Sequence, residues 1–191
     1  MTDMEIILAS GSPRRRELLN TLGLSFTVHP ARGEEIAPLG AGPEEIVKAL
    51  SKAKAEEVAR EFPDNLIIAA DTIVYLDGRV LGKPKDEDDA KAMLSKLSGR
   101  AHEVYTGVTV ISGDKTICEA ECTKVFFREV SAEEIDSYVA SGDPMDKAGA
   151  YGIQGKAALM VERLEGDYFN VMGLPLCRLG KMLRTIGVRL L

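Results

Sequence analysis

The segment 66–76, with the sequence LIIAADTIVYL, constrains the fold more than any other part of the chain. Its apolar residues run almost without interruption, which is typical of a strand buried on both faces in the middle of a sheet. Asp71 lies inside this strand, and a buried carboxylate must be paired, bind a metal or act on a substrate at a cleft. Taken alone, Asp71 fits a structural ion pair as well as it fits a functional role.

Strand and helix patterns alternate along the rest of the chain. Strands are expected at 5–9, 26–29, 66–75, 79–81, 104–111, 117–129 and 157–164, and helices at 12–22, 43–62, 86–97, 131–140 and 174–186. This alternation predicts an α/β or mixed α+β fold. Because no repeat or linker divides the sequence, residues 1–191 are expected to form a single domain, with two lobes around a cleft.

Composition excludes several classes of function. The net charge is −6, from 24 Lys and Arg against 30 Asp and Glu, so no basic excess is present for general binding to DNA or RNA. The three cysteines cannot form a disulfide framework, and the two histidines are too few for a histidine-rich zinc site. The apolar run 6–9 is too short for a signal peptide, and 66–76 is about half a membrane span. A cytoplasmic protein without a membrane segment is therefore expected.

Three arginines follow Pro13 in the segment 10–16, SGSPRRR. Ser12 and Pro13 predict a helix start, where the helix dipole is already positive and each arginine is disfavoured by about 0.3–1 kcal/mol. A bound anion removes this conflict, because helix N-terminal amides and guanidinium groups both bind phosphate oxygens. The alternative is that the arginines extend into solvent or pair with Glu17.

Lys54 lies on the apolar stripe of the helix expected at 43–62. A helical wheel places it between Leu50 and Val58, so its ammonium group must either reach solvent along the helix or meet a buried anion. Both interpretations stay open at this stage.

Further polar groups are weaker candidates. Lys83 follows a glycine soon after the Asp71 strand, and the doublet Glu34-Glu35 lies in a loop. Gln154 is flanked by glycines, and its amide can donate to and accept from a base edge, although a tight turn is the simpler interpretation. These cations and acids together fit a nucleotide triphosphate with a divalent metal. The Walker and GxGxxG phosphate-binding motifs are both missing from the sequence.

The chain resembles the Maf family of nucleotide pyrophosphatases over nearly its whole length, from about residue 6 to 183. The matching segments stand in the order of that family at 9–15 (ASGSPRR), 70–72 (ADT), 82–84 (GKP), 146–155 (DKAGAYGIQG) and 173–175 (GLP). The resemblance implies an elongated mixed central sheet flanked by helices, in a Maf/ITPase-like fold. It also implies a homodimer in many members.

The resemblance implies metal-dependent hydrolysis of nucleoside triphosphates to the monophosphate and pyrophosphate, with Mg²⁺ or Mn²⁺. Members that act on dTTP and UTP carry Arg, Thr and Gln at three discriminating positions, which match Arg14, Thr72 and Gln154 here. The implied substrates are therefore dTTP and UTP, in house-cleaning of the nucleotide pool. Phosphate-binding and catalytic positions carry over onto a further set of residues, which comprises Ser10, Arg14, Arg15, Lys54, Asp71 and Lys83.

The expected reaction is attack of water on the α-phosphorus. Asp71 would act as general base or as a ligand of the metal that activates the water, and Glu34 or Glu35 would complete the metal site. Two alternatives remain: a nucleotide-sensing regulator of cell division or septation, with incidental turnover, and an enzyme that removes modified pyrimidine triphosphates.

Overall fold

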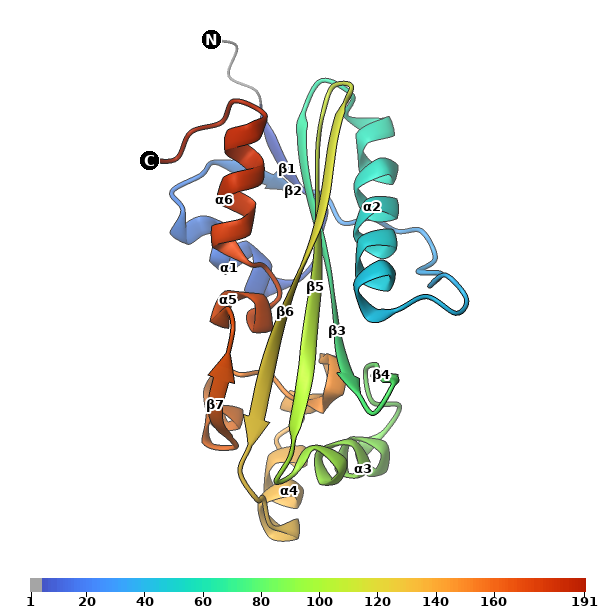
Figure 1. The fold of residues 1–191 in the computed structure, drawn as a ribbon, viewed down its shortest axis with the longest axis vertical. Coiled ribbons are helices and arrows are strands. Elements are labelled where there is room, and N and C mark those ends of the chain that lie inside the picture. The colour runs from blue at the N-terminus through green and yellow to red at the C-terminus, as the bar shows by residue number, and fades with distance from the viewer. Residues whose placement is uncertain (1–4) are drawn as a thin grey trace. The chain divides into compact units, whose positions relative to one another are not determined.

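The computed structural model describes residues 5–191, which form a mixed α/β fold (Figure 1). The strands are β1 (Ile6–Leu8), β2 (Phe26–Val28), β3 (Leu66–Leu76), β4 (Arg79–Leu81), β5 (Ala101–Ser112), β6 (Lys115–Phe127) and β7 (Val161–Glu165). The α-helices are α1 (Pro13–Thr21), α2 (Pro43–Glu61), α3 (Glu87–Leu97), α4 (Ala132–Val139), α5 (Tyr168–Met172) and α6 (Leu176–Thr185). Three short 3-10 helices are η1 (Asp143–Asp146), η2 (Ala148–Ala150) and η3 (Gly155–Leu159).

The strands form one mixed sheet in the order β2-β1-β3-β5-β6-β7, and β4 pairs with β3 off this path. β1 pairs in parallel with both β2 and β3. β3 is antiparallel to β4, and β6 is antiparallel to β7. The mixed α/β class expected from the sequence is thereby confirmed.

The chain forms two compact units. Among the described residues, unit 1 contains 5–71, 106–121 and 173–191, and unit 2 contains 72–105 and 122–172. β3, β5 and β6 each contribute residues to both units. The single domain with a cleft between two lobes stays a prediction.

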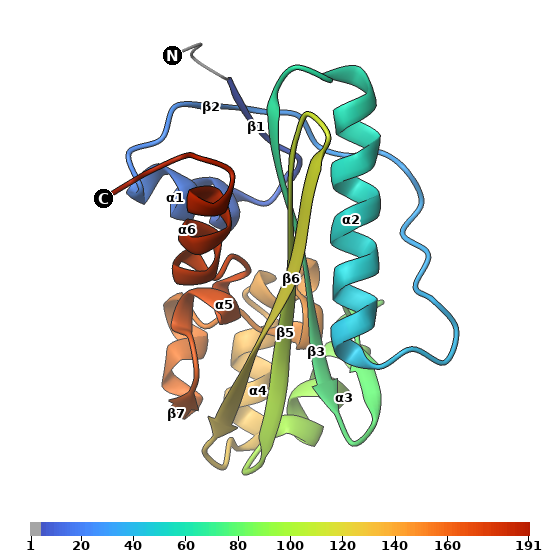
Figure 2. The same ribbon diagram turned by 45° about the horizontal axis from the view of Figure 1, so that its top comes forward.

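In unit 1, α2 packs on the strands that carry the apolar runs of the N-terminal half. Ile7 and Ile67 contact a cluster that includes Ala55 and Val58 of α2, all of them buried. α2 lies on one side of these strands, and α1 and α6 lie on the other (Figures 1 and 2). Local signals set the ends of these helices: Ser12 caps α1 through its side chain, and Pro43 begins α2.

Unit 2 has its own apolar core beneath α3 and α4. These two helices contact each other, and α4 begins with a capping box in which Ser131 and Glu134 exchange hydrogen bonds. Val74, Leu94 and Phe127 belong to the buried cluster that they cover.

Two sequence-based expectations in unit 2 need correction. The strand expected at 157–164 begins only at residue 161, because 155–159 form the 3-10 helix η3 after Gly155, whose φ is +68°. The helix α5 was not expected, since five residues are too few to show a helical repeat. Among residues 5–191, no helix is both long enough and apolar enough to span a membrane.

Candidate active site

Asp71 is held in a buried ion pair with Lys54. Asp71 lies on β3 with its side chain 8% exposed, and the Nζ atom of Lys54 on α2 donates to Asp71 Oδ1 over 2.7 Å. The lysine on the apolar stripe of α2 therefore meets a buried anion. Charged hydrogen bonds of this length are among the stronger ones in proteins.

A second carboxylate contacts the same ammonium group. Glu35 Oε1 lies 2.9 Å from Lys54 Nζ, and the Glu35 side chain is 59% exposed. The sequence left the register of the Glu34-Glu35 doublet open, and in the structure Glu35 is the member that reaches Lys54, while Glu34 is exposed. One ammonium group thus joins two carboxylates from distant parts of the sequence.

Arg15 is fixed beside this group by hydrogen bonds at the start of α1. Its Nε atom donates to the carbonyl oxygen of Gly173 over 2.8 Å, and its Nη1 atom donates to the hydroxyl of Ser10 over 3.2 Å. Arg15 therefore does not extend into solvent, whereas Arg16 is exposed. Ser10 is itself buried, with 7% of its surface accessible.

The electrostatics of Arg15 show which charges lie near it. Burial lowers the pKa of its guanidinium group, attraction by Asp71 opposes this effect, and repulsion by Arg14 adds to it. Glu35 also acts to raise this pKa. Asp71, Glu35 and Arg14 therefore each lie within electrostatic reach of Arg15.

Unit 1 thus brings together most of the expected residues. This charge cluster, as we call it below, consists of Ser10, Arg14, Arg15, Glu35, Lys54 and Asp71. Among residues 5–191, no three His, Cys, Asp or Glu side chains are grouped so as to hold a metal ion. The charge cluster therefore contains two carboxylates, which do not by themselves form a complete metal site.

Apart from Glu34, the other expected residues belong to unit 2. Thr72 follows Asp71 on β3, and Lys83 is exposed in the loop after β4. Gln154 is half-buried and immediately precedes η3. The segments around Lys83 and Gln154 are joined, because the Gly149 amide donates to the Gly82 carbonyl over 3.0 Å.

A buried aromatic group that the sequence analysis missed supports the Gln154 segment. His102 Nε2 and the Tyr151 hydroxyl are hydrogen-bonded at 2.7 Å, and Phe127 packs edge-on against both rings. Burial lowers the pKa of His102 to about 4 and raises that of Tyr151. His102 Nδ1 is a buried atom without a hydrogen-bond partner. Neither residue carries a distinctive sequence spacing, so only the structure reveals the pair.

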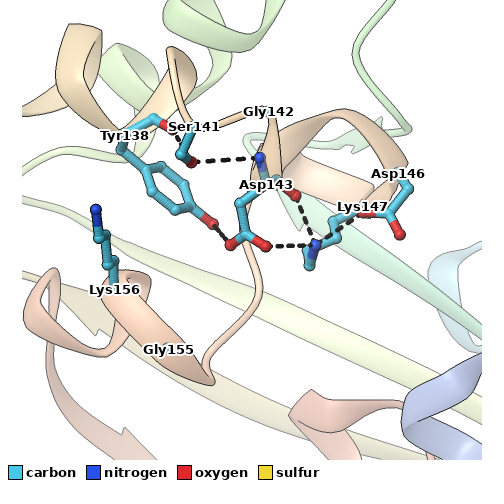
Figure 3. A pocket seen from close by; sticks show the side chains of 8 residues that line it. All are labelled: Tyr138, Ser141, Gly142, Asp143, Asp146, Lys147, Gly155 and Lys156. Carbon is cyan, nitrogen blue, oxygen red and sulfur yellow. Dashed lines mark hydrogen bonds and ion pairs between the residues drawn. The ribbon is translucent and has the colours of Figure 1, made fainter.

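A pocket of about 610 Å³ in unit 2 adjoins the end of the Gln154 segment (Figure 3). Gly155 and Lys156 line one side of it, and the Tyr138 hydroxyl donates to Asp143 within it. The Lys147 ammonium group is bonded to Asp143 and Asp146, as the dashed lines in Figure 3 show. The charge of Lys147 is therefore paired with two exposed carboxylates, and the role visible for this residue is to close the turn at η1.

The chain is similar to known proteins over nearly its whole length. The Maf-like protein family matches residues 5–186. A protein named dTTP/UTP pyrophosphatase from Bacillus cereus (strain AH820) is 49% identical over 184 residues, covering 96% of each chain. A protein of the same name from Bacillus anthracis (strain CDC 684 / NRRL 3495) is 48% identical, again over 96% of each chain.

A solved structure supports the fold. The HAM1 protein from Coxiella burnetii superimposes with a TM-score of 0.50 at 15% sequence identity, over 95% of this chain and 99% of that one. This likeness concerns the arrangement of the backbone. The sequence comparisons, which extend over nearly the whole chain, establish that the protein belongs to the Maf family.

Proposed function

We propose that this protein is a nucleoside triphosphate pyrophosphatase that hydrolyses dTTP and UTP to the monophosphate and pyrophosphate. One observation carries the reaction class: the charge cluster places Arg15 and Lys54 beside two carboxylates, with Arg14 next to Arg15. Cations of this kind neutralise a triphosphate, and a carboxylate can activate water. The names of the relatives from Bacillus cereus and Bacillus anthracis support the substrates.

The roles of individual residues follow from their chemistry. Ser10, Arg15 and Lys54 bind phosphate oxygens, because each presents a donor in the charge cluster. Lys83, on its exposed loop, contributes a further positive charge. The base is discriminated by a set that the family resemblance names: Arg14, Thr72 and Gln154.

The chemical step is attack of water on the α-phosphorus. A bond forms between the water oxygen and phosphorus while the bond to the bridging oxygen breaks, and pyrophosphate leaves with that electron pair. Asp71 takes the water proton at Oδ2, since Lys54 donates to Oδ1 and orients the carboxylate. Arg15 stabilises the negative charge that develops on the leaving group.

The donor set also fits a divalent metal. Asp71 and Glu35 converge on one ammonium group, and Mg²⁺ is typically bound by one or two carboxylates together with substrate phosphates. We therefore assign Glu35 to the metal, with Glu34 outside the site, and leave Asp71 Oδ2 for the proton of the attacking water. When bound, Mg²⁺ or Mn²⁺ supplies Lewis-acid polarisation of the phosphate oxygens.

The test is a substrate panel. The purified protein is incubated with each common nucleoside triphosphate and with 5-methylated and pseudouridine triphosphates, in Mg²⁺, in Mn²⁺ and in EDTA, and pyrophosphate is measured. We expect dTTP and UTP to be hydrolysed at least about 10-fold faster than purine nucleotides, and EDTA to abolish turnover. Tight nucleotide binding without pyrophosphate release would contradict the proposal and favour a sensor.

A further inference from the structure

The loop between β2 and α2 carries Glu35, and one side chain of α2 holds the backbone of that loop. The amide of Arg32 donates to Glu57 Oε1 over 2.7 Å, and the amide of Gly33 donates to Glu57 Oε2 over 2.9 Å. Each oxygen of the Glu57 carboxylate therefore accepts a hydrogen bond from one of two consecutive amides, which lie just before Glu35 in the sequence.

Gly33 makes this close approach possible. A Cβ atom at position 33 would lie 2.6 Å from Glu57 Oε2, far inside van der Waals contact. Any larger residue would push the carboxylate away from the two amides. Glycine at 33 and glutamate at 57 therefore act together as one loop anchor, the term we use for this pair and the Arg32 amide.

The loop anchor lies next to the charge cluster through the geometry of α2. Glu57 follows Lys54 by about one turn of the helix, so both side chains leave the same face. The same face thus supplies the anchor for the loop and the ammonium group that Glu35 contacts at 2.9 Å. The anchor therefore holds the backbone of the loop two residues before the exposed Glu35 side chain that contacts Lys54.

We propose that Glu57 is a positioning residue, which holds the loop so that Glu35 meets the ammonium group of Lys54 that also binds Asp71. This inference rests on the proposed function, since Glu35 is there assigned to the metal. The hydrogen bonds from the Arg32 and Gly33 amides also lower the pKa of Glu57, with smaller contributions from the charges of Arg60 and Arg32. Glu57 therefore stays ionised, as an anchor for two amide donors must.

The test compares Glu57→Ala and Glu57→Gln with Glu56→Ala. Glu56 is the neighbouring residue on α2 and pairs with Lys52 at 3.8 Å, so its removal controls for loss of a negative charge from the helix. We expect Glu57→Ala to lower kcat/KM for dTTP about 10-fold, and Glu57→Gln to be intermediate because it keeps one acceptor oxygen. Glu56→Ala should match the wild type.

A double variant separates positioning from general stability. If Glu57 acts through Glu35, adding Glu57→Ala to Glu35→Ala should cause no further loss of kcat/KM. Additive losses, or a Glu57→Ala variant as active as Glu56→Ala, would overturn the inference.

Amide hydrogen exchange tests the loop anchor independently of the proposed enzymatic activity. The amides of residues 32 and 33 should exchange at least about 10-fold faster in Glu57→Ala than in Glu56→Ala. If the wild type releases no pyrophosphate, the proposed function fails, and this exchange still decides whether Glu57 holds the loop. Equal exchange in the two variants would refute the anchor itself.

Discussion

The ammonium group of Lys54 keeps two carboxylates at short range in a partly buried place. Its side chain is 17% exposed, and it bonds Asp71 at 2.7 Å and Glu35 at 2.9 Å. Two negative charges and one positive charge leave an excess of one negative charge, which Arg15 offsets. Removing one partner of such a pair costs several kcal/mol, because the remaining buried charge is uncompensated. A bound metal and triphosphate would redistribute the same charges.

Asp71→Asn tests the role of the carboxylate. The amide keeps nearly the same shape and an oxygen for Lys54, but it cannot take a proton from water. We expect turnover of dTTP to fall about 10²–10⁴-fold while nucleotide binding, measured by calorimetry, persists. Asp64→Asn, at an exposed position, is the matched control. Near-full turnover by Asp71→Asn would refute the assigned role.

Gln154→Ala tests base recognition. The half-buried amide is proposed to read the base edge, so its loss should relax selectivity more than it weakens phosphate binding. We expect the ratio of kcat/KM for UTP over CTP to fall about 10-fold, with inhibition by pyrophosphate unchanged. Equal losses for every base would count against this role.

Gly173→Ala tests how Arg15 is held. Gly173 has a φ of +113°, and its carbonyl accepts the Arg15 Nε hydrogen bond. Alanine at such a φ is strained by about 1–3 kcal/mol, and relief of the strain moves the carbonyl. We expect the KM for dTTP to rise in addition to a loss of stability. Gly187→Ala, with a φ of +97°, should lose stability without a change in KM.

At the scale of elements, the position of Lys54 depends on how closely α2 approaches the sheet. A Cβ atom at Gly107 of β5 would lie 2.1 Å from the carbonyl oxygen of Val47 on α2. The two backbones are therefore in direct contact at this point, which only glycine permits. The buried residues Leu50 and Val58 complete the packing on either side of Lys54.

Gly107→Ala should therefore displace α2. Because the obstacle is backbone and not a flexible side chain, we expect a loss of about 1–3 kcal/mol or more in the free energy of unfolding, measured in urea. Pyrophosphatase activity should fall with it, since Lys54 moves with the helix. Gly180→Ala has open space around its Cβ position and should leave both quantities near the wild-type values. Unchanged stability in Gly107→Ala would show that α2 can shift freely.

Elements with local signals were predictable from the sequence. The helix start at Ser12 and Pro13 appears where expected, and the helix expected at 131–140 is α4, which begins with the Ser131 capping box. The helix α5 could not be predicted in this way, because it is too short to show a helical repeat. The side chain of Asp167 accepts hydrogen bonds from amides in its first turn. The apolar residues of η3 resemble a strand, so the sequence predicts an earlier start for β7 than the structure has.

At the scale of the molecule, the charge cluster joins segments far apart in the chain. Helical periodicity placed Lys54 on the buried face of α2, and the apolar strand marked Asp71 as unusual, so both were predictable. The Gly173 carbonyl and the Glu57 anchor were not, because a backbone acceptor has no residue signature and a helix-surface glutamate is usually solvated. Which of Glu34 and Glu35 contacts Lys54 depends on the path of the loop, so the sequence alone could not predict it.

The buried His102 should make the stability of the protein depend on pH. The folded protein keeps this imidazole neutral down to about pH 4, whereas in the unfolded chain it gains a proton near its ordinary pKa of 6.5. The free energy of unfolding should therefore decrease as the pH falls from about 6.5 to about 4, by about 3 kcal/mol in total. Urea denaturation at several pH values measures this decrease.

His102→Gln should flatten the pH dependence above about pH 5, where most carboxylates are still ionised. His29→Gln retains His102 and should retain the decrease. An equal slope in His102→Gln and the wild type would assign the effect to other groups.

The two terminal strands of the sheet are poor templates for aggregation. β2 has three residues, and β7 has five, with Glu162, Arg163 and Glu165 among them. Short strands and charged side chains at an edge discourage the addition of further strands from another chain. Concentrated solutions of the folded protein should therefore resist the growth of intermolecular β-structure along these margins.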